Sequence, residues 1–231
     1  MAKATDITVE DARGLVSDRL LWPRVRDFLW DFAPQVHARW VEDLLSRSGA
    51  MVQSVMGSPR VKRYVLASLG VEPCFHTFPK DDGSRLLLLD GATLESVAKW
   101  LGALACAKKL RGVTSGADVR ALKAALPGIY PDVFGYVAYF EGSEIEDLGF
   151  KIEEGSLGEI GRLGWHILLS LLDSLPASLV ARLKLKLPKT YSDAANPQSS
   201  ILNPQSSIFN QKSLTRLLKL KFPEAYSLCC S

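Results

Sequence analysis

The chain has 231 residues, of which 47% are hydrophobic and 23% are charged, and its formal net charge is +3. These fractions are ordinary for globular proteins and exclude a disordered, collagen-like or disulfide-scaffold chain, while the length suits one large domain or two small ones. The charge is unevenly placed. Residues 179–231 hold 8 Lys and Arg against 2 Asp and Glu, a net of +6, which leaves 20 against 23, a net of −3, for residues 1–178. A slightly acidic body therefore carries a basic tail.

The first residues predict no secretory signal, because they contain no apolar core segment. No window reaches 18 uninterrupted apolar residues, so we expect a chain that does not span a membrane. None of the cysteines, Cys74, Cys106, Cys229 and Cys230, forms a C-x-x-C pair. Cys106 lies in an apolar run, where a thiol behaves as a small hydrophobic side chain. This cysteine usage indicates a reducing, cytoplasmic compartment.

Apolar residues at helical spacing predict a mainly α fold, a compact multi-helix domain. Ser and Thr before the runs, Pro in first turns and Gly after last turns are typical helix boundaries. In chain order, helices are expected from Thr8, over Trp22–Pro34 with a continuation to Gly49, from Ser58 to Gly70, from Thr93 to Gly112, over Ser115–Leu126, from Pro131, over Ile160–Leu175 and from Pro176 to Pro188.

One segment departs from the helical pattern. Cys74–Phe78 and Arg85–Leu89 flank the turn-rich sequence Lys-Asp-Asp-Gly-Ser, whose Asp-Gly pair favours positive φ. Two apolar runs around such a turn predict a small β-hairpin near residues 74–89.

The tail contains two repeats. Asn-Pro-Gln-Ser-Ser-Ile occurs twice, seven residues apart, and residues 178–192 realign on residues 213–227 with nine of fifteen positions identical. The polar linker between the two basic segments cannot bury enough apolar surface to order itself. We therefore divide the chain into a helical domain, residues 1–192, and a flexible, disordered or partly helical extension, residues 193–231. We expect the second copy to be a passive duplication; the alternative is a docking segment that raises effective concentration for a partner.

Catalytic motifs are absent from the sequence. It has no phosphate-binding loop, no dinucleotide-binding glycine motif, and no H-E-x-x-H or G-x-S-x-G element. Cys74 and His76 offer two ligands to zinc, but no second pair follows at a usual spacing. The carboxylate pairs Asp81–Asp82 and Glu153–Glu154 are in loops, where such pairs are usually solvated. We therefore expect no enzyme activity, cofactor or metal, and an enzyme with a site outside known motifs is the weakest alternative.

A basic cluster is predicted on two neighbouring helices. It consists of Lys108, Lys109, Arg111, Arg120 and Lys123. Phosphate contacts require such a cluster, but the body is net acidic and helix C-termini attract cations for local reasons. We expect no nucleic-acid partner, and keep a helical nucleic-acid-binding or regulatory module that uses residues 108–123 as the alternative function.

An ordered set of motifs lies between residues 86 and 131. An apolar run is followed by a helix ending in W-L-G-A-L-x-x-x-x-x-L-R and then by G-x-x-V-R-x-L-K-x-A-L. This stretch resembles the core of the K-subunit family of bacterial type III secretion systems, which includes the Yop translocation K protein and the MxiK and OrgA accessory proteins. Residues 175–188 resemble the C-terminal end of that family. The resemblance spans roughly residues 60–190 and excludes the second basic copy.

The resemblance implies a non-enzymatic, mainly helical adaptor of the sorting platform, at the cytoplasmic face of the inner membrane and peripheral to it. The implied partners are the cytoplasmic domain of the inner-membrane ring and the C-ring-like platform protein, through which the ATPase complex is recruited. Candidate contact residues are Arg120 and Lys123, whose plainer interpretation is a solvated helix face, together with Lys184 and Lys186 of the first basic copy. The Leu-Lys-Leu-Lys-Leu sequence of that copy also has the charge to contact anionic lipid.

Overall fold

The computed structural model describes residues 21–46, 52, 54–71, 82–137, 157–172, 175–192 and 211–230. Over these residues the chain is mainly α-helical, as the sequence predicts, and contains no β-strand. The first helices are α2 (Leu21–Leu29), η1 (Ala33–Gln35), α3 (Ala38–Leu45), α5 (Pro59–Ser68), α6 (Asp82–Arg85), η2 (Leu86–Leu88), α7 (Gly91–Ala105) and α8 (Ala107–Arg111). The remaining ones are α9 (Gly116–Ala125), α10 (Val133–Tyr136), α11 (Leu157–Ser170), α12 (Ala177–Leu185), α13 (Lys189–Ser192), α14 (Gln211–Lys221) and α15 (Pro223–Cys230).

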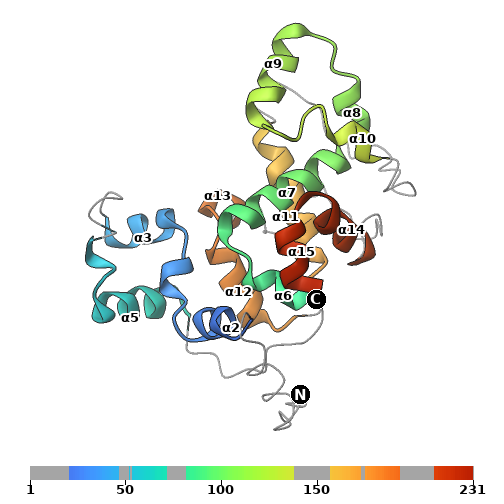
Figure 1. Ribbon diagram of the computed structural model, residues 1–231. Coiled ribbons are helices and arrows are strands. Elements are labelled where there is room, and N and C mark those ends of the chain that lie inside the picture. Colours follow the sequence, from blue (N-terminus) through green and yellow to red (C-terminus); the bar gives the residue numbers. More distant parts are fainter. Residues whose placement is uncertain are drawn as a thin grey trace.

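Helices α7 and α11 pack together in the middle of the molecule (Figure 1). Leu94 and Leu101 of α7 and Ile160 of α11 are fully buried. At the closest approach, Gly102 of α7 faces Gly164 of α11, and a methyl group on either glycine would overlap backbone atoms of the other helix. Side chains usually hold packed helix axes about 8–10 Å apart, so a glycine pair is what permits this contact.

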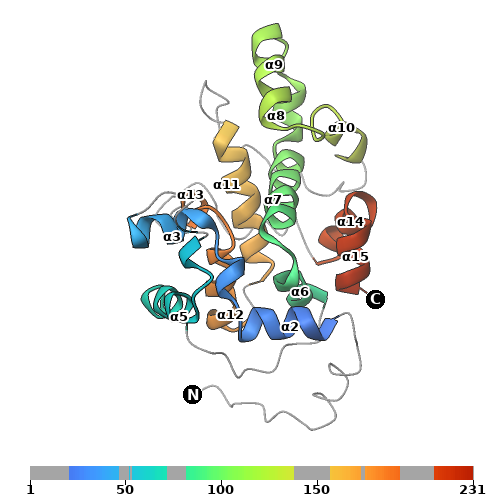
Figure 2. The same cartoon turned by 60° about the vertical axis from the view of Figure 1, so that its left-hand side comes forward.

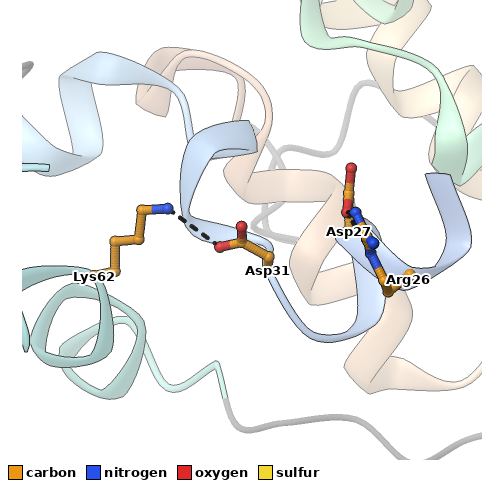
Figure 3. Close-up of polar contacts among 4 residues, drawn as sticks. All are labelled: Arg26, Asp27, Asp31 and Lys62. Carbon is orange, nitrogen blue, oxygen red and sulfur yellow. Dashed lines mark hydrogen bonds and ion pairs between the residues drawn. The ribbon is translucent and has the colours of Figure 1, made fainter. Parts of the chain in front are cut away.

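Helices α2, α3 and α5 lie at one end of this central pair, and α8, α9 and α10 lie at the other end (Figures 1 and 2). Helix α2 follows the predicted pattern, because Leu21, Val25, Phe28 and Leu29 recur at helical spacing and all are buried. Across the surface, Lys62 of α5 reaches Asp31, just after α2, with 3.4 Å between Nζ and Oδ1 (Figure 3). Both side chains are partly exposed, so this ion pair contributes at most about 1 kcal/mol.

Several helix ends match the sequence signals, and others do not: α2 ends at Leu29, before Pro34, and the helix expected from Thr93 to Gly112 is divided at Cys106 into α7 and α8. Ser58 precedes α5 with Pro59 in the first turn, and Gly70 follows it at φ +69°. Helix α7 is capped by Asp90, not by Thr93: the Asp90 carboxylate accepts hydrogen bonds of 2.8 Å from the Thr93 amide and hydroxyl groups. Helix α3 ends at Ser46, which is left-handed, before the Gly49 that we expected to end it.

The predicted β-hairpin is wrong in its second half. Arg85 ends α6, Leu86–Leu88 form the 3₁₀-helix η2, and Leu89 follows it in an extended conformation. The four consecutive leucines 86–89 are all buried. Helical turns bury side chains on every side when protein surrounds them, whereas a half-exposed strand would have left alternate leucines in water. The first half, Cys74–Phe78, lies outside the described residues.

The second basic copy forms helices α14 and α15, so the described part of the extension is helical. Leu214, Leu217 and Leu218 are buried, and α15 packs on α6. Both views place this pair of helices alongside α6 and the adjoining part of α7 (Figures 1 and 2). Among the described helices, none is long and apolar enough to cross a membrane.

Candidate functional site

Helix α9 carries the first two candidate contact residues. Arg120 and Lys123 are both exposed, and α9 buries only Leu122 among its ten residues. The helix protrudes at the end of the molecule together with α8 (Figure 2). Residues 107–126 hold five cations and Asp118, a net charge of +4. The structure thus brings Arg120 and Lys123 to one accessible, positively charged end of the molecule.

Lys184 and Lys186, the other two candidates, have different surroundings. Lys184 is half-buried, whereas Lys186 is 2% exposed. The Nζ atom of Lys186 donates to the carbonyl oxygens of Leu87 at 2.6 Å and Leu89 at 2.8 Å, and lies 4.9 Å from the centre of the Phe28 ring. Burial lowers the pKa of Lys186 to about 7, and this effect outweighs the negative charge of Asp90, which acts in the opposite direction. As a partner contact, Lys186 is therefore a wrong choice: its ammonium group lies inside the core.

Sequence analysis did not single out Arg182, one helical turn before Lys186. It is 3% exposed, and its Nη1 atom donates to the carbonyls of Phe28 at 2.6 Å and Leu29 at 3.0 Å. These carbonyls end α2, where the last turn has no intrahelical donors. The guanidinium carbon also lies 5.5 Å from the centre of the Phe32 ring. Arg182 and Lys186 thus bind α12 to two other parts of the core.

The end of the first copy contacts α3. The indole nitrogen of Trp40 donates to the Leu187 carbonyl at 2.9 Å, and the Lys189 ammonium lies 3.0 Å from Asp43 and 5.7 Å from the centre of the Trp40 ring. The first copy is therefore a structural element that joins α2, η2 and α3.

The second copy places Lys221 where the first copy has Lys186 in the repeat alignment. The Lys221 Nζ atom lies 4.6 Å from the centre of the Trp100 ring, 4.3 Å from that of Tyr136 and 3.4 Å from the Asp132 carboxylate. The two rings meet edge to face at 81°, with centres 5.6 Å apart. Trp100, Tyr136 and Asp132 form what we call the lysine cage. Two aromatic faces and a carboxylate attract an ammonium group by cation–π and ionic forces.

Each copy therefore places a lysine ammonium group against the rest of the molecule. Lys186 of the first copy contacts backbone carbonyl groups in the core, and Lys221 of the second copy contacts two aromatic rings closer to the surface. The side chain of Lys221 remains 18% exposed, compared with 2% for the whole of Lys186. The position of Arg182 is taken by Leu217 in the second copy. The repeat alignment could have pointed to Lys221, because it pairs this residue with Lys186. The two aromatic residues of the cage, Trp100 and Tyr136, lie outside the repeat.

A second accessible surface lies on α2. Trp22 and Arg26 of α2 and Trp30, the first residue after it, are spaced four residues apart. Trp22 is half-buried, and the two indole rings meet edge to face with their centres 5.7 Å apart. Trp30 is 46% exposed. Arg26 pairs with Asp27 at 2.8 Å, and Figure 3 shows this pair beside Asp31 and Lys62. Tryptophan and arginine are enriched among residues that dominate protein–protein binding.

Cys106 and His37 have structural surroundings. Burial raises the pKa of the Cys106 thiol to about 11, which keeps it protonated near neutral pH. His37 precedes α3, and its Nδ1 atom accepts a hydrogen bond of 3.2 Å from the Arg39 amide. Within the described residues, no group of three or more His, Cys, Asp or Glu side chains could hold a metal ion. Cys74 and His76 lie outside those residues.

Comparison of the chain with protein-family models, with curated proteins and with solved structures finds no match.

Proposed function

We propose that the protein is a non-enzymatic adaptor of a bacterial type III secretion sorting platform, located in the cytoplasm at the inner membrane. In this role it links the inner-membrane ring to the C-ring-like platform protein and so to the ATPase complex. The proposal starts from the resemblance of residues 86–131 to the K-subunit family.

The observation that carries the proposal is the way these residues divide between core and surface. The W-L-G-A-L motif lies in α7, where Trp100, Leu101 and Gly102 are buried against the rest of the molecule. The V-R-x-L-K motif lies in α9, where Leu122 is buried while Arg120 and Lys123 are exposed. One half of the motif thus supports a scaffold, and the other half presents charged side chains at a protruding end, as an adaptor requires.

Affinity capture tests the proposal. The tagged full-length chain is expressed in a bacterium that has a complete secretion apparatus, and the captured proteins are identified by mass spectrometry. We expect the ring and platform proteins with the native chain and their loss with the double substitution Arg120→Glu, Lys123→Glu. The matched control is Arg60→Glu, Arg63→Glu, the same charge change on exposed positions of α5. A folded native chain that captures neither protein contradicts the proposal.

The same protruding end favours one other function, nucleic-acid binding. Lys108, Arg111, Arg120 and Lys123 are exposed, and Lys109 is half-buried. Counterion release makes binding of a duplex by such a cluster weaken steeply with salt. If this is the function, binding to labelled DNA or RNA falls by at least about tenfold between 50 and 200 mM salt, for several phosphate contacts. Absent or salt-insensitive binding removes this candidate.

A further inference from the structure

The C-terminal unit, α14 and α15, is joined to the rest of the chain through residues 193–210 alone. Its two helices pack against each other, and α15 packs against α6. Eighteen residues reach at most roughly 60 Å when fully extended. A connection of this length does not oblige the unit to dock on the chain that carries it.

The surface on which the C-terminal unit docks binds one particular group of that unit, the Lys221 ammonium. The lysine cage holds the Lys221 ammonium between the Trp100 and Tyr136 rings, next to Asp132. The unit itself is basic, since Lys212, Arg216, Lys219 and Lys221 outnumber Glu224. The basic unit and Asp132 of the cage are therefore opposite in charge, and the buried leucines of α14 add an apolar contact.

The two copies of the repeat differ in the buried hydrogen bonds that would be lost if each copy separated from the core. Removing the first copy would strip Phe28, Leu29, Leu87 and Leu89 of the donors that Arg182 and Lys186 provide. At the position of Arg182 the second copy has Leu217, whose side chain has no donor, and the side chain of Lys221 is 18% exposed in the docked state. Undocking of the second copy would therefore leave the donors of the Phe28, Leu29, Leu87 and Leu89 carbonyls in place.

We propose that the lysine cage is a binding site for the C-terminal unit of a second copy of this chain. Two chains that exchange their units fill both cages with the same contacts that one chain makes by itself, and the product is a closed two-fold dimer. Within one chain the tether supplies an effective concentration of around 1 mM. The native chain is therefore monomeric at micromolar concentration and exchanges units as its concentration approaches the millimolar range.

Complementation between two full-length variants tests the proposal, because it removes the competition within one chain. The free-cage variant, Leu217→Asp with Lys221→Ala, keeps the cage but has a unit that cannot dock. The broken-cage variant, Asp132→Ala with Tyr136→Ala, keeps the unit. With different affinity tags on the two variants, we expect each alone to be monomeric and the mixture to form a 1:1 complex at micromolar concentration. Folding of both variants is checked by near-UV circular dichroism.

Two additions to the broken-cage variant provide matched controls on one helix. Lys221→Ala weakens the 1:1 complex, whereas Lys219→Ala leaves it intact, because Lys219 lies near Tyr226 of its own unit. Failure of two folded variants to bind each other overturns the proposal. Should the free-cage variant fail to fold, two tagged populations of the native chain are mixed at about 1 mM. Mixed complexes that Lys221→Ala suppresses support the proposal, and the absence of mixed complexes overturns it.

Discussion

Gly102 of α7 and Gly164 of α11 face each other so closely that a Cβ atom built on Gly102 would lie 3.0 Å from the backbone nitrogen of Gly164, and one built on Gly164 would lie 2.6 Å from that of Gly102. Such a Cβ atom would also overlap the carbonyl oxygens of Ile160 and Ala98 respectively. Since backbone atoms cannot rotate away as a side chain can, the central helix pair depends on both positions remaining without a side chain.

Gly102→Ala is therefore expected to destabilise the protein by at least about 2–3 kcal/mol, because α7 and α11 must move apart across the fully buried core. Urea unfolding followed by circular dichroism measures the change. The control is Gly135→Ala in α10, where a Cβ atom has open space and alanine is the better helix former. Equal stability of Gly102→Ala and the native chain would show that the two helices do not cross as described.

The burial of Lys186 predicts that the free energy of unfolding depends on pH. Its pKa is about 7 in the folded chain and about 10.5 when unfolded, so between these values the unfolded state binds the proton that the folded state has lost. The free energy of unfolding therefore rises with pH, by about 1–2 kcal/mol between pH 7 and 8.5. Lys186→Met removes this rise, whereas Lys184→Met retains it. Urea unfolding of the three proteins at both pH values measures the difference, and an unchanged slope in Lys186→Met would contradict the assignment.

Arg182→Leu introduces the residue that the second copy has at this position. It removes the donor to the Phe28 and Leu29 carbonyls, which end α2, and it is expected to lower the free energy of unfolding by about 2–4 kcal/mol. Arg26→Leu on the exposed side of α2 changes it by less than about 0.5 kcal/mol. Chemical denaturation compares the two, and similar stability of both variants would argue against the buried role of Arg182.

The C-terminal unit contributes to stability if its leucines are buried as described. Leu217 is completely buried and Leu220 is 43% exposed on the same helix. Leu217→Ala is expected to weaken docking of the unit by about 2–4 kcal/mol, and Leu220→Ala by well under 1 kcal/mol. Hydrogen exchange of amides 211–230 reports the docking. Equal protection in both variants would instead support a passive second copy.

Helical periodicity predicted much of the fold because most helices here lie on the surface of one core. Val25, Phe28 and Leu29 are buried where the pattern places them, and Ser58, Gly70 and Ser115 mark helix boundaries. Periodicity failed at Leu86–Leu89, because protein surrounds this segment on all sides. A segment without exposed polar residues shows no alternation that could distinguish a helix from a strand.

The candidate site was less predictable, because sequence reasoning places cations on the surface by default. This placement holds for Arg120 and Lys123 but not for Lys186, whose burial depends on the carbonyls of Leu87 and Leu89, nearly a hundred positions earlier in the chain. A buried lysine is rare, and its sequence neighbours give no sign of it. The lysine cage is also formed by tertiary contact, since Trp100 and Tyr136 lie far from Lys221 in sequence.

Trp100 is only 5% exposed where it contacts Lys221. An ammonium group above an indole ring alters the electronic environment of that ring, and water replaces it when α14 leaves. The intensity and wavelength of Trp100 emission therefore change when the C-terminal unit undocks, so Trp100, one of five tryptophans in the chain, is an intrinsic optical reporter of this equilibrium.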